Sequence, residues 1–287
     1  MKNSTCIAIL FLLITAACTD NPFSDNGALQ SRNSIVGQVE LPEGANGVRP
    51  YIWLDKINLG AFSDSSGRFS LKLPSPANQP GNGFSGSLTL YCYIGNYKID
   101  TRQVLMNDGE FLYGQGDLNK NGGIVSALSP AKMLNVQTDV IPLIISPDVD
   151  EVIAVNMNLR AVSSPVRVSL TTADSTVFAS AVAVRTDTTA FVSLPIQRGP
   201  TSPVSQLISA NGVTLETQFT ISQNSLSQGE YRILPSVWVE GTGVPANLLA
   251  SLATEAAVFD AGYARIPFDR LGGTFSVSVS KDSTEAP

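Results

Sequence analysis

The chain contains no histidine among its 287 residues, and this absence removes several familiar kinds of active site. Catalysis by Ser-His-Asp or Cys-His groups, metal sites built on imidazole and histidine-based pH switches are all excluded. Charged residues are scarce, at 15%, and the 24 acidic residues outnumber the 18 basic ones. An acidic chain without basic runs is poorly suited to nucleic acid, so we expect no nucleic-acid partner.

Cysteine is also rare, with Cys6, Cys18 and Cys92 as the three examples. Cys6 lies inside the N-terminal apolar run and Cys18 ends it, so removal of that run would leave Cys92 with at most one partner. We therefore expect no disulfide framework, no metal site and no cofactor. Cys92 lies on the apolar face of a predicted strand, which favours a core residue over a reactive thiol.

Residues 1–17 have the pattern of a secretory signal peptide. Their apolar run is shorter than the roughly 20 residues that a transmembrane helix needs. Two small residues, Ala16 and Ala17, are followed directly by Cys18, and this pattern resembles the lipobox of bacterial lipoproteins, whose cysteine is acylated. Thr15 stands where leucine is usual, and an ordinary cleaved signal peptide is the alternative.

Residues 18–34 are polar and rich in turn-forming residues, which predicts a flexible tether. Lipid on Cys18 would anchor this tether and hold the folded part close to a membrane. Thr19 rather than aspartate follows the cysteine, which favours sorting to the outer membrane. We expect a protein of the bacterial cell envelope that faces the periplasm or the cell surface.

Residues 35–112 alternate between apolar and polar positions, as half-buried β-strands do. Gly67 closes a turn-forming cluster in which glycine adopts a positive φ without steric cost. The predicted strands of this segment cover 35–41, 51–54, 57–61, 69–73 and 88–94.

Four stretches of the same segment carry a family resemblance. They are Val36-Gly37-Gln38-Val39, Tyr51-Ile52-Trp53-Leu54, Ser63-Asp64-Ser65-Ser66-Gly67-Arg68-Phe69-Ser70-Leu71 and Tyr93-Ile94-Gly95-Asn96-Tyr97-Lys98. Together they resemble a carboxypeptidase regulatory-like domain, a family similar to transthyretin. The resemblance covers just over a quarter of the chain. It implies a small β-sandwich that has no catalytic residues and that packs, presents loops or binds partners.

Residues 113–139 are rich in glycine, asparagine and small side chains, which indicates a connector. Asp117 opens a stretch that resembles a calcium loop, but Leu128 stands where the twelfth position needs a carboxylate, so a plain turn is favoured. Ser129 and Lys132 match the Ser-x-x-Lys pattern of serine β-lactamase-like enzymes without the partner motifs. We interpret Ser129 as a helix N-cap instead.

Residues 140–280 predict a second antiparallel β-sandwich, because short strands alternate with turn-forming residues. Gly229-Glu230-Tyr231 resembles the start of a late strand in immunoglobulin-like folds. A helix is predicted near 245–257, and 281–287 is expected to be a disordered tail. The predicted strands are 152–159, 166–170, 176–184, 190–194, 213–221, 231–239, 264–268 and 274–280. The fold class is thus all-β, with two sandwiches, transthyretin-like and then immunoglobulin-like.

The sequence favours a lipid-anchored envelope protein with a non-catalytic structural or protein-binding role. Its partners would be the membrane, through the anchor, and an envelope protein or a glycan. A glycan-binding accessory lipoprotein is the alternative, because aromatic rings commonly stack on sugars. The candidate ligand-binding aromatics are Trp53, Tyr91, Tyr93, Tyr97 and Trp238.

An enzyme is the third possibility, and a pair of carboxylates is the histidine-free route that remains for it. Glycosidases place two carboxyl groups about 5–10 Å apart. The acids that could form such a pair are Asp117, Asp148, Asp150 and Glu151. Acidic residues in loops are more often solvated surface charges than catalytic groups, so we expect no catalytic residues.

Overall fold

The computed structural model describes residues 32–43, 45, 47–173, 178–188, 192–252 and 259–279. The predicted signal peptide, Cys18 and the C-terminal tail lie outside these residues. The described residues from Asn33 onward belong to one compact unit. Within this part of the chain, no helix is both long enough and apolar enough to cross a membrane.

The first β-sandwich is built on a five-stranded antiparallel sheet with the order β3-β2-β5-β6-β7. Its strands are β2 (Tyr51–Leu54), β3 (Leu59–Phe62), β5 (Gly86–Tyr93), β6 (Asp100–Asn107) and β7 (Glu110–Phe111). The opposite layer is the antiparallel pair β1 (Ser34–Gln38) and β4 (Arg68–Lys72). Two short 3₁₀ helices, η1 (Pro76–Asn78) and η2 (Pro80–Asn82), lie between β4 and β5.

The core of this sandwich follows the alternation of the sequence. Leu88, Leu90 and Cys92 on β5 are all 0% exposed, which confirms the prediction that Cys92 is a core residue. The same core takes in Leu118 and Leu128, which lie in the stretch expected to be a connector. Leu128 also forms an isolated β-bridge with Val39. The first sandwich therefore extends well past residue 112.

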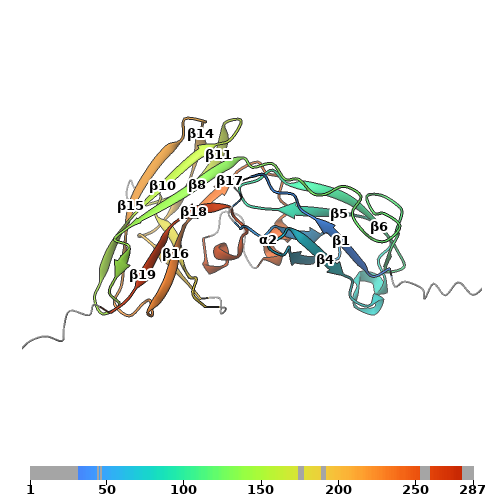
Figure 1. Cartoon of the computed structure of the whole chain (residues 1–287), viewed down its shortest axis with the longest axis horizontal. Helices are drawn as coiled ribbons and strands as arrows, with labels where there is room; N and C mark the ends of the chain where they lie inside the picture. The colour runs from blue at the N-terminus through green and yellow to red at the C-terminus, as the bar shows by residue number, and fades with distance from the viewer. Residues whose placement is uncertain are drawn as a thin grey trace, which may run out of the picture. The chain divides into compact units, whose positions relative to one another are not determined.

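The second β-sandwich contains three sheets around one core (Figure 1). The first sheet has the order β15-β10-β8-β18 and consists of β8 (Leu134–Ile141), β10 (Glu151–Ala161), β15 (Val213–Ile221) and β18 (Arg270–Gly272). The second has the order β13-β12-β16-β19-β9 and consists of β9 (Ile144–Ile145), β12 (Ser180–Arg185), β13 (Ser193–Gln197), β16 (Gly229–Pro235) and β19 (Thr274–Val277). The third has the order β14-β11-β17 and consists of β11 (Val166–Thr172), β14 (Ser202–Ile208) and β17 (Val237–Val239).

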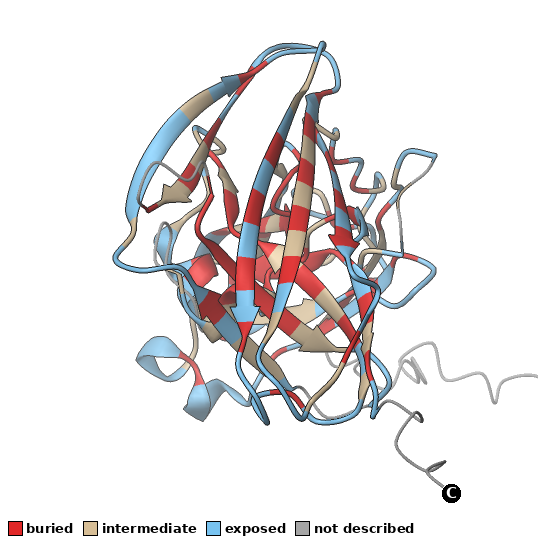
Figure 2. Ribbon diagram, turned by 90° about the vertical axis from the view of Figure 1, so that its left-hand side faces the viewer, coloured by how far each residue is buried: buried red, intermediate tan, exposed pale blue. Residues whose placement is uncertain are grey.

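Period-two burial runs along the long strands of the second sandwich, as the alternating colours in Figure 2 show. The all-β fold class is confirmed. The pairing is antiparallel except for β18 with β8 and β19 with β9, which are parallel. Tyr231 at the start of β16 donates a hydrogen bond from its hydroxyl to the Ser227 carbonyl at 2.9 Å, so the predicted strand start is tied back to its preceding loop.

Two local predictions are wrong. Residues 264–268 do not form a strand, because a 3₁₀ helix, η3 (Ala261–Arg265), begins where the Asp260 carboxylate accepts a hydrogen bond from the Gly262 N–H at 2.6 Å. Ser129 does not cap a helix, because the chain around it is not helical and its N–H donates to Asp100 Oδ2 at 2.8 Å. The predicted helix near 245–257 is confirmed as α2 (Ala246–Ser251).

Candidate functional site

The outer face of the first sandwich is covered by residues from the end of the chain. Tyr51 and Trp53 on β2 and Tyr93 on β5 point away from the first core and are nevertheless buried. They share a third hydrophobic cluster with Leu248, Leu249, Leu252, Tyr263 and Ile266. All four residues of β2 are buried because each of its two faces packs against a different core. We call this contact region the junction.

A buried polar network crosses the junction. The Asn96 amide donates to the carbonyl oxygens of Leu134 at 2.7 Å and Asp269 at 2.9 Å, and its oxygen accepts from the Asp269 N–H at 3.0 Å. Tyr97 donates its hydroxyl proton to Asp269 Oδ2 at 2.7 Å, and Lys132 Nζ lies 2.8 Å from the same oxygen. The carboxylate of Asp269 is therefore buried but compensated.

Arg270 extends the network on the side of the second sandwich. Its Nη1 donates to the Pro235 carbonyl at 3.0 Å and its Nη2 donates to the Tyr263 hydroxyl at 2.5 Å. Its guanidinium carbon also lies 4.1 Å from the centre of the Phe268 ring, within the range of a cation–π contact. The guanidinium group of Arg270 therefore packs against one face of the Phe268 ring and holds it in place.

Burial sets the protonation of the groups in and beside the junction. Burial raises the pKa of the Tyr97 hydroxyl far above its ordinary value, and its hydrogen bond to Asp269 raises it further. Burial is also the main cause of the raised pKa values of Tyr93 and of the Cys92 thiol. All three groups are neutral at physiological pH, so Cys92 lacks the thiolate character of a reactive cysteine.

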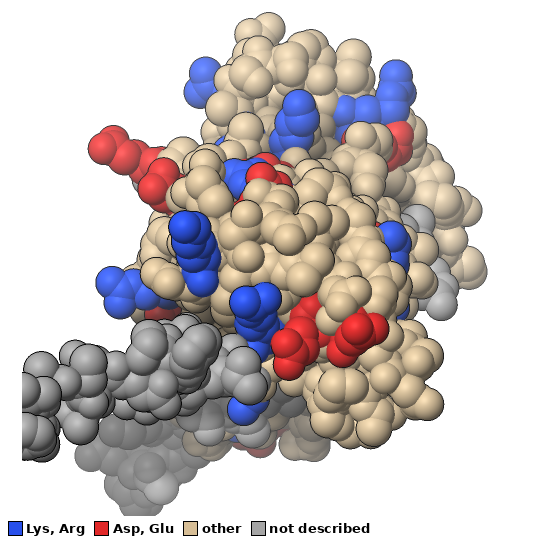
Figure 3. Space-filling model, turned by 90° about the vertical axis from the view of Figure 1, so that its right-hand side faces the viewer, with Lys and Arg blue, Asp and Glu red and all other residues tan. Residues whose placement is uncertain are grey.

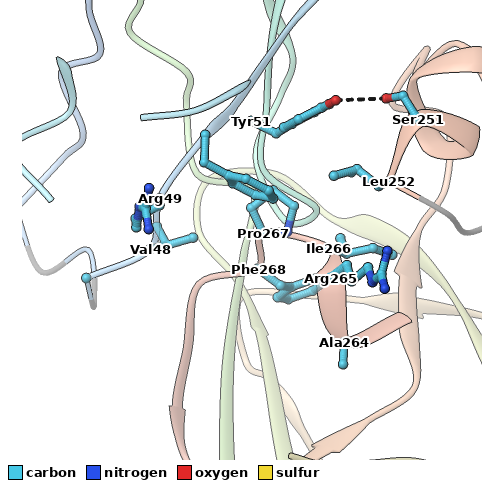
Figure 4. A pocket seen from close by; sticks show the side chains of 12 residues that line it. Val48, Arg49, Tyr51, Ser251, Leu252, Ala264, Arg265, Ile266, Pro267 and Phe268 are labelled. Carbon is cyan, nitrogen blue, oxygen red and sulfur yellow. Dashed lines mark hydrogen bonds between the residues drawn. The ribbon is translucent and has the colours of Figure 1, made fainter. Parts of the chain in front are cut away.

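A cavity of about 530 Å³ opens at the edge of the junction (Figure 4). In its wall, the Tyr51 hydroxyl lies 3.1 Å from Ser251 Oγ, and the Tyr51 and Phe62 rings have their centres 5.0 Å apart. The Nε of Arg49 donates to the Ser63 carbonyl at 2.6 Å. The lining residues come from both sandwiches: Gly47, Val48, Arg49, Tyr51, Phe62, Ser251, Leu252, Ala264, Arg265, Ile266, Pro267 and Phe268. We call this space the arginine-rimmed cavity.

A second cavity of about 320 Å³ lies beside Trp238. Trp238 is half-buried and its ring meets the Tyr263 ring edge-on at 5.5 Å between centres. Tyr93, Ser169, Glu240 and Thr242 are among the other residues that line the same space. The lining of this cavity therefore combines aromatic residues with polar and acidic ones.

The structure separates the five aromatic residues predicted to bind a ligand. Trp53, Tyr93 and Tyr97 are 2%, 3% and 1% exposed, so most of each side chain is packed, although Tyr93 lines the cavity beside Trp238 and Trp53 lines a further cavity with Lys56 and Asn58. The Trp53 indole N–H is also engaged by Asn58 Oδ1 at 2.9 Å. The structure therefore brings Tyr93 and Trp238 together at one cavity, whereas Tyr97 is buried with its hydroxyl bonded to Asp269, and ligand binding by these residues stays a prediction. Tyr91 and Trp238 are partly exposed.

The candidate acids do not gather at either cavity. Asp117 lies in a turn, as predicted, and accepts a hydrogen bond from the Gln103 N–H at 2.6 Å in the first sandwich. Asp150 accepts from the Gln223 N–H at 2.8 Å in the second, and Asp148 and Glu151 are its neighbours in sequence. The part of the chain that the structure describes contains no cluster of three or more His, Cys, Asp or Glu side chains suited to a metal ion.

Charges of both signs are interspersed on the face of the molecule shown in Figure 3. The Ser-x-x-Lys motif has a structural explanation, because Lys132 is held in the ion pair with Asp269. Sequence reasoning missed Arg49, Asn96, Asp269 and Arg270. The signal that could have indicated the last two is an adjacent acid and base directly after the apolar residues 266–268.

Comparisons with known proteins do not assign a family. No protein-family model matches the sequence, and no curated protein matches it. Among solved structures, the chain is similar to a mutant of the major pilin of Streptococcus pyogenes. The identity is 9% and the TM-score is 0.20, over 70% of this chain and 81% of the pilin chain. A likeness at this level carries no argument about function.

Proposed function

We propose that the protein is a lipid-anchored component of the bacterial cell envelope that binds another protein and catalyses no reaction. The anchor would be Cys18, which directly follows a signal-peptide-like apolar run. Lipidation at this position would keep the two sandwiches beside a membrane, and the outer membrane is the favoured one.

The observation that supports the binding role is that the buried charged side chains of the described residues bond within the junction and line neither of the two cavities. Among the described residues, Asp269 and Arg270 are the buried charged side chains, and both bond within the junction. An active site instead directs its ionisable groups at a space that substrate can reach. Here buried charge holds two sandwiches together, which keeps their loops and cavities in fixed relative positions for a partner.

The anchor is tested by metabolic labelling with radioactive palmitate in cells that make the protein. We expect label in the wild type and none in Cys18→Ser, which should also leave the membrane fraction. Cys6→Ser is the matched control, because Cys6 lies within the apolar run, and it should keep the label. Label retained by Cys18→Ser would reject the anchor.

The orientation and the partner are tested in the same cells. Protease added to intact cells removes the sandwiches if they face outward, and it removes them only after lysis if they face the periplasm. Crosslinking followed by purification should recover one envelope protein in stoichiometric amount. Repeated recovery of the protein alone would contradict the binding role.

Glycan binding is a second candidate, favoured by the cavity beside Trp238. Its half-buried ring, with Glu240 and Thr242 nearby, has the mix of apolar face and hydrogen-bonding groups that sugars need. We expect a glycan-array signal that Trp238→Ala removes and that Phe62→Ala, at the other cavity, leaves unchanged. An array without signal for the folded wild type would reject this candidate.

A further inference from the structure

The arginine-rimmed cavity has apolar walls that the fold holds in place. Phe268 is backed by the Arg270 guanidinium at 4.1 Å, and Tyr51 is held by its contact with Ser251 Oγ at 3.1 Å. Phe62 completes the wall and is 41% exposed, so part of its ring is available to a ligand. A preformed apolar space of about 530 Å³ falls within the range of ligand-binding sites in proteins.

Positive charge lies at the rim of this space. Arg49 and Arg265 lie on opposite sides of Phe268 in the view of Figure 4, and both are exposed. Among the described residues that line the cavity there is no aspartate or glutamate, although the chain as a whole has a net charge of −6. The site therefore favours a ligand with an anionic group and an apolar body.

Arg49 is the residue best prepared to take that anionic group. Its Nε donates to the Ser63 carbonyl at 2.6 Å, which orients the guanidinium plane. The bonds of the described chain leave both of its Nη groups without a partner. A carboxylate can accept two parallel hydrogen bonds from such a group.

The backbone beside the cavity offers a further contact. β3 is an edge strand of the five-stranded sheet, and it ends at Phe62 on the cavity wall. In the described chain no strand is paired with its outer edge, although β4 follows β3 in the chain and lies close to it. An edge strand binds an extended peptide through main-chain hydrogen bonds, and this favours a polypeptide over a small molecule as the occupant.

We propose that the arginine-rimmed cavity binds the C-terminal end of a partner polypeptide. The free α-carboxylate pairs with Arg49, the last apolar side chain packs against Tyr51, Phe62 and Phe268, and the preceding residues lie along β3. This inference rests on the proposed protein-binding function and names the part of the partner that is recognised.

The test compares two fluorescent pentapeptides that end in Val-Leu-Phe, one with a free carboxylate and one with a C-terminal amide. Binding to the full-length protein is followed by fluorescence anisotropy in the same detergent throughout. We expect the acid to bind at least tenfold more tightly than the amide. Arg49→Gln should reduce the affinity of the acid to that of the amide, and Arg49→Lys should restore part of the difference.

Two matched controls separate recognition from general damage. Arg167→Gln changes another exposed arginine, on β11, and Leu207→Ser changes an exposed apolar residue on β14. Neither residue lines the cavity, so neither change should affect binding, whereas Phe62→Ser should weaken both peptides. Equal binding of acid and amide, or acid binding that survives Arg49→Gln, overturns the proposal.

Dodecanoate, added as a competitor, distinguishes a lipid-derived carboxylate from a chain end. Binding of dodecanoate without binding of either peptide also overturns the proposal. Failure here is distinguishable from failure of the proposed function, because palmitate labelling and partner recovery do not use these peptides. A protein that is labelled and crosslinks to a partner but ignores both peptides rejects this site alone.

Discussion

Asp269 shows how a single residue can hold two domains together. Its side chain is 0% exposed, and a carboxylate so placed is costly unless it is paired. Lys132 and Tyr97 both bond to its Oδ2, and Asn96 bonds to its backbone. The partners all precede it by more than a hundred residues, so their bonds exist only when the junction is formed.

Removal of the cationic partner, Lys132, should therefore strongly reduce the stability of the fold. We expect Lys132→Met to lower the free energy of unfolding by about 3–5 kcal/mol, because it leaves a buried carboxylate without its cation. Urea unfolding followed by circular dichroism measures the loss. Arg185→Met removes the same charge from the surface ion pair with Asp187 and should have a much smaller effect. Equal effects would mean that the buried pair has no special role.

Alkaline pH should weaken the junction through Tyr97. Because the pKa of its hydroxyl is raised in the folded state, its contribution to stability is complete below the ordinary value of 10.0. As the pH rises above 10.0, the unfolded chain loses this proton first, so stability falls. We expect the melting temperature to drop as the pH rises from about 10 to 12, less steeply in Tyr97→Phe. Identical slopes in both proteins would contradict this.

Among the elements, strands with strict alternation could be predicted from sequence. The predicted 213–221 coincides with β15, since each inward position is apolar or threonine on a half-exposed sheet. The predicted 231–239 is interrupted at Ser236, where the chain passes from β16 into β17 of another sheet. β14 was not predicted because it is a mostly exposed edge strand that contains Pro203.

The candidate site could be predicted only in part, because alternation says which residues share a face and not what covers that face. In the structure, Tyr51, Trp53 and Tyr93 lie on the faces of β2 and β5 that point away from the first core. What buries them is α2 and η3, some two hundred residues further along the chain. No local pattern in β2 or β5 encodes that contact.

Gly95 follows β5 at the junction. Because it has no side chain, the Phe268 ring can pack directly against its backbone. A Cβ atom at Gly95 would lie 2.6 Å from Phe268 Cδ2, and the Gly95 N–H donates to the Pro267 carbonyl at 2.7 Å. We expect Gly95→Ala to cost about 1–3 kcal/mol of stability through overpacking, as measured by urea unfolding. Phe268→Leu in the same chain should recover part of the loss, and a strictly additive double variant would contradict the contact.

At the scale of the whole molecule, the junction couples the unfolding of the two sandwiches. Each sandwich has its own core, and the third cluster joins them through residues of both. We expect a single calorimetric transition for the wild type. Asn96→Ala removes three hydrogen bonds of the junction and should split it into two transitions. Two transitions already present in the wild type would show that the sandwiches unfold independently.

The late position of α2 and η3 has a consequence for biogenesis. The core of the first sandwich is complete once residue 128 has been made, but the cover of its aromatic outer face is completed only when α2 and η3 follow. During synthesis, Tyr51, Trp53 and Tyr93 would face solvent beside a growing chain, and exposed aromatic surface of this kind binds chaperones and promotes aggregation. We expect truncation before residue 246 to leave a first sandwich that is folded but prone to aggregation. Folding is therefore complete only after α2 and η3 have been made.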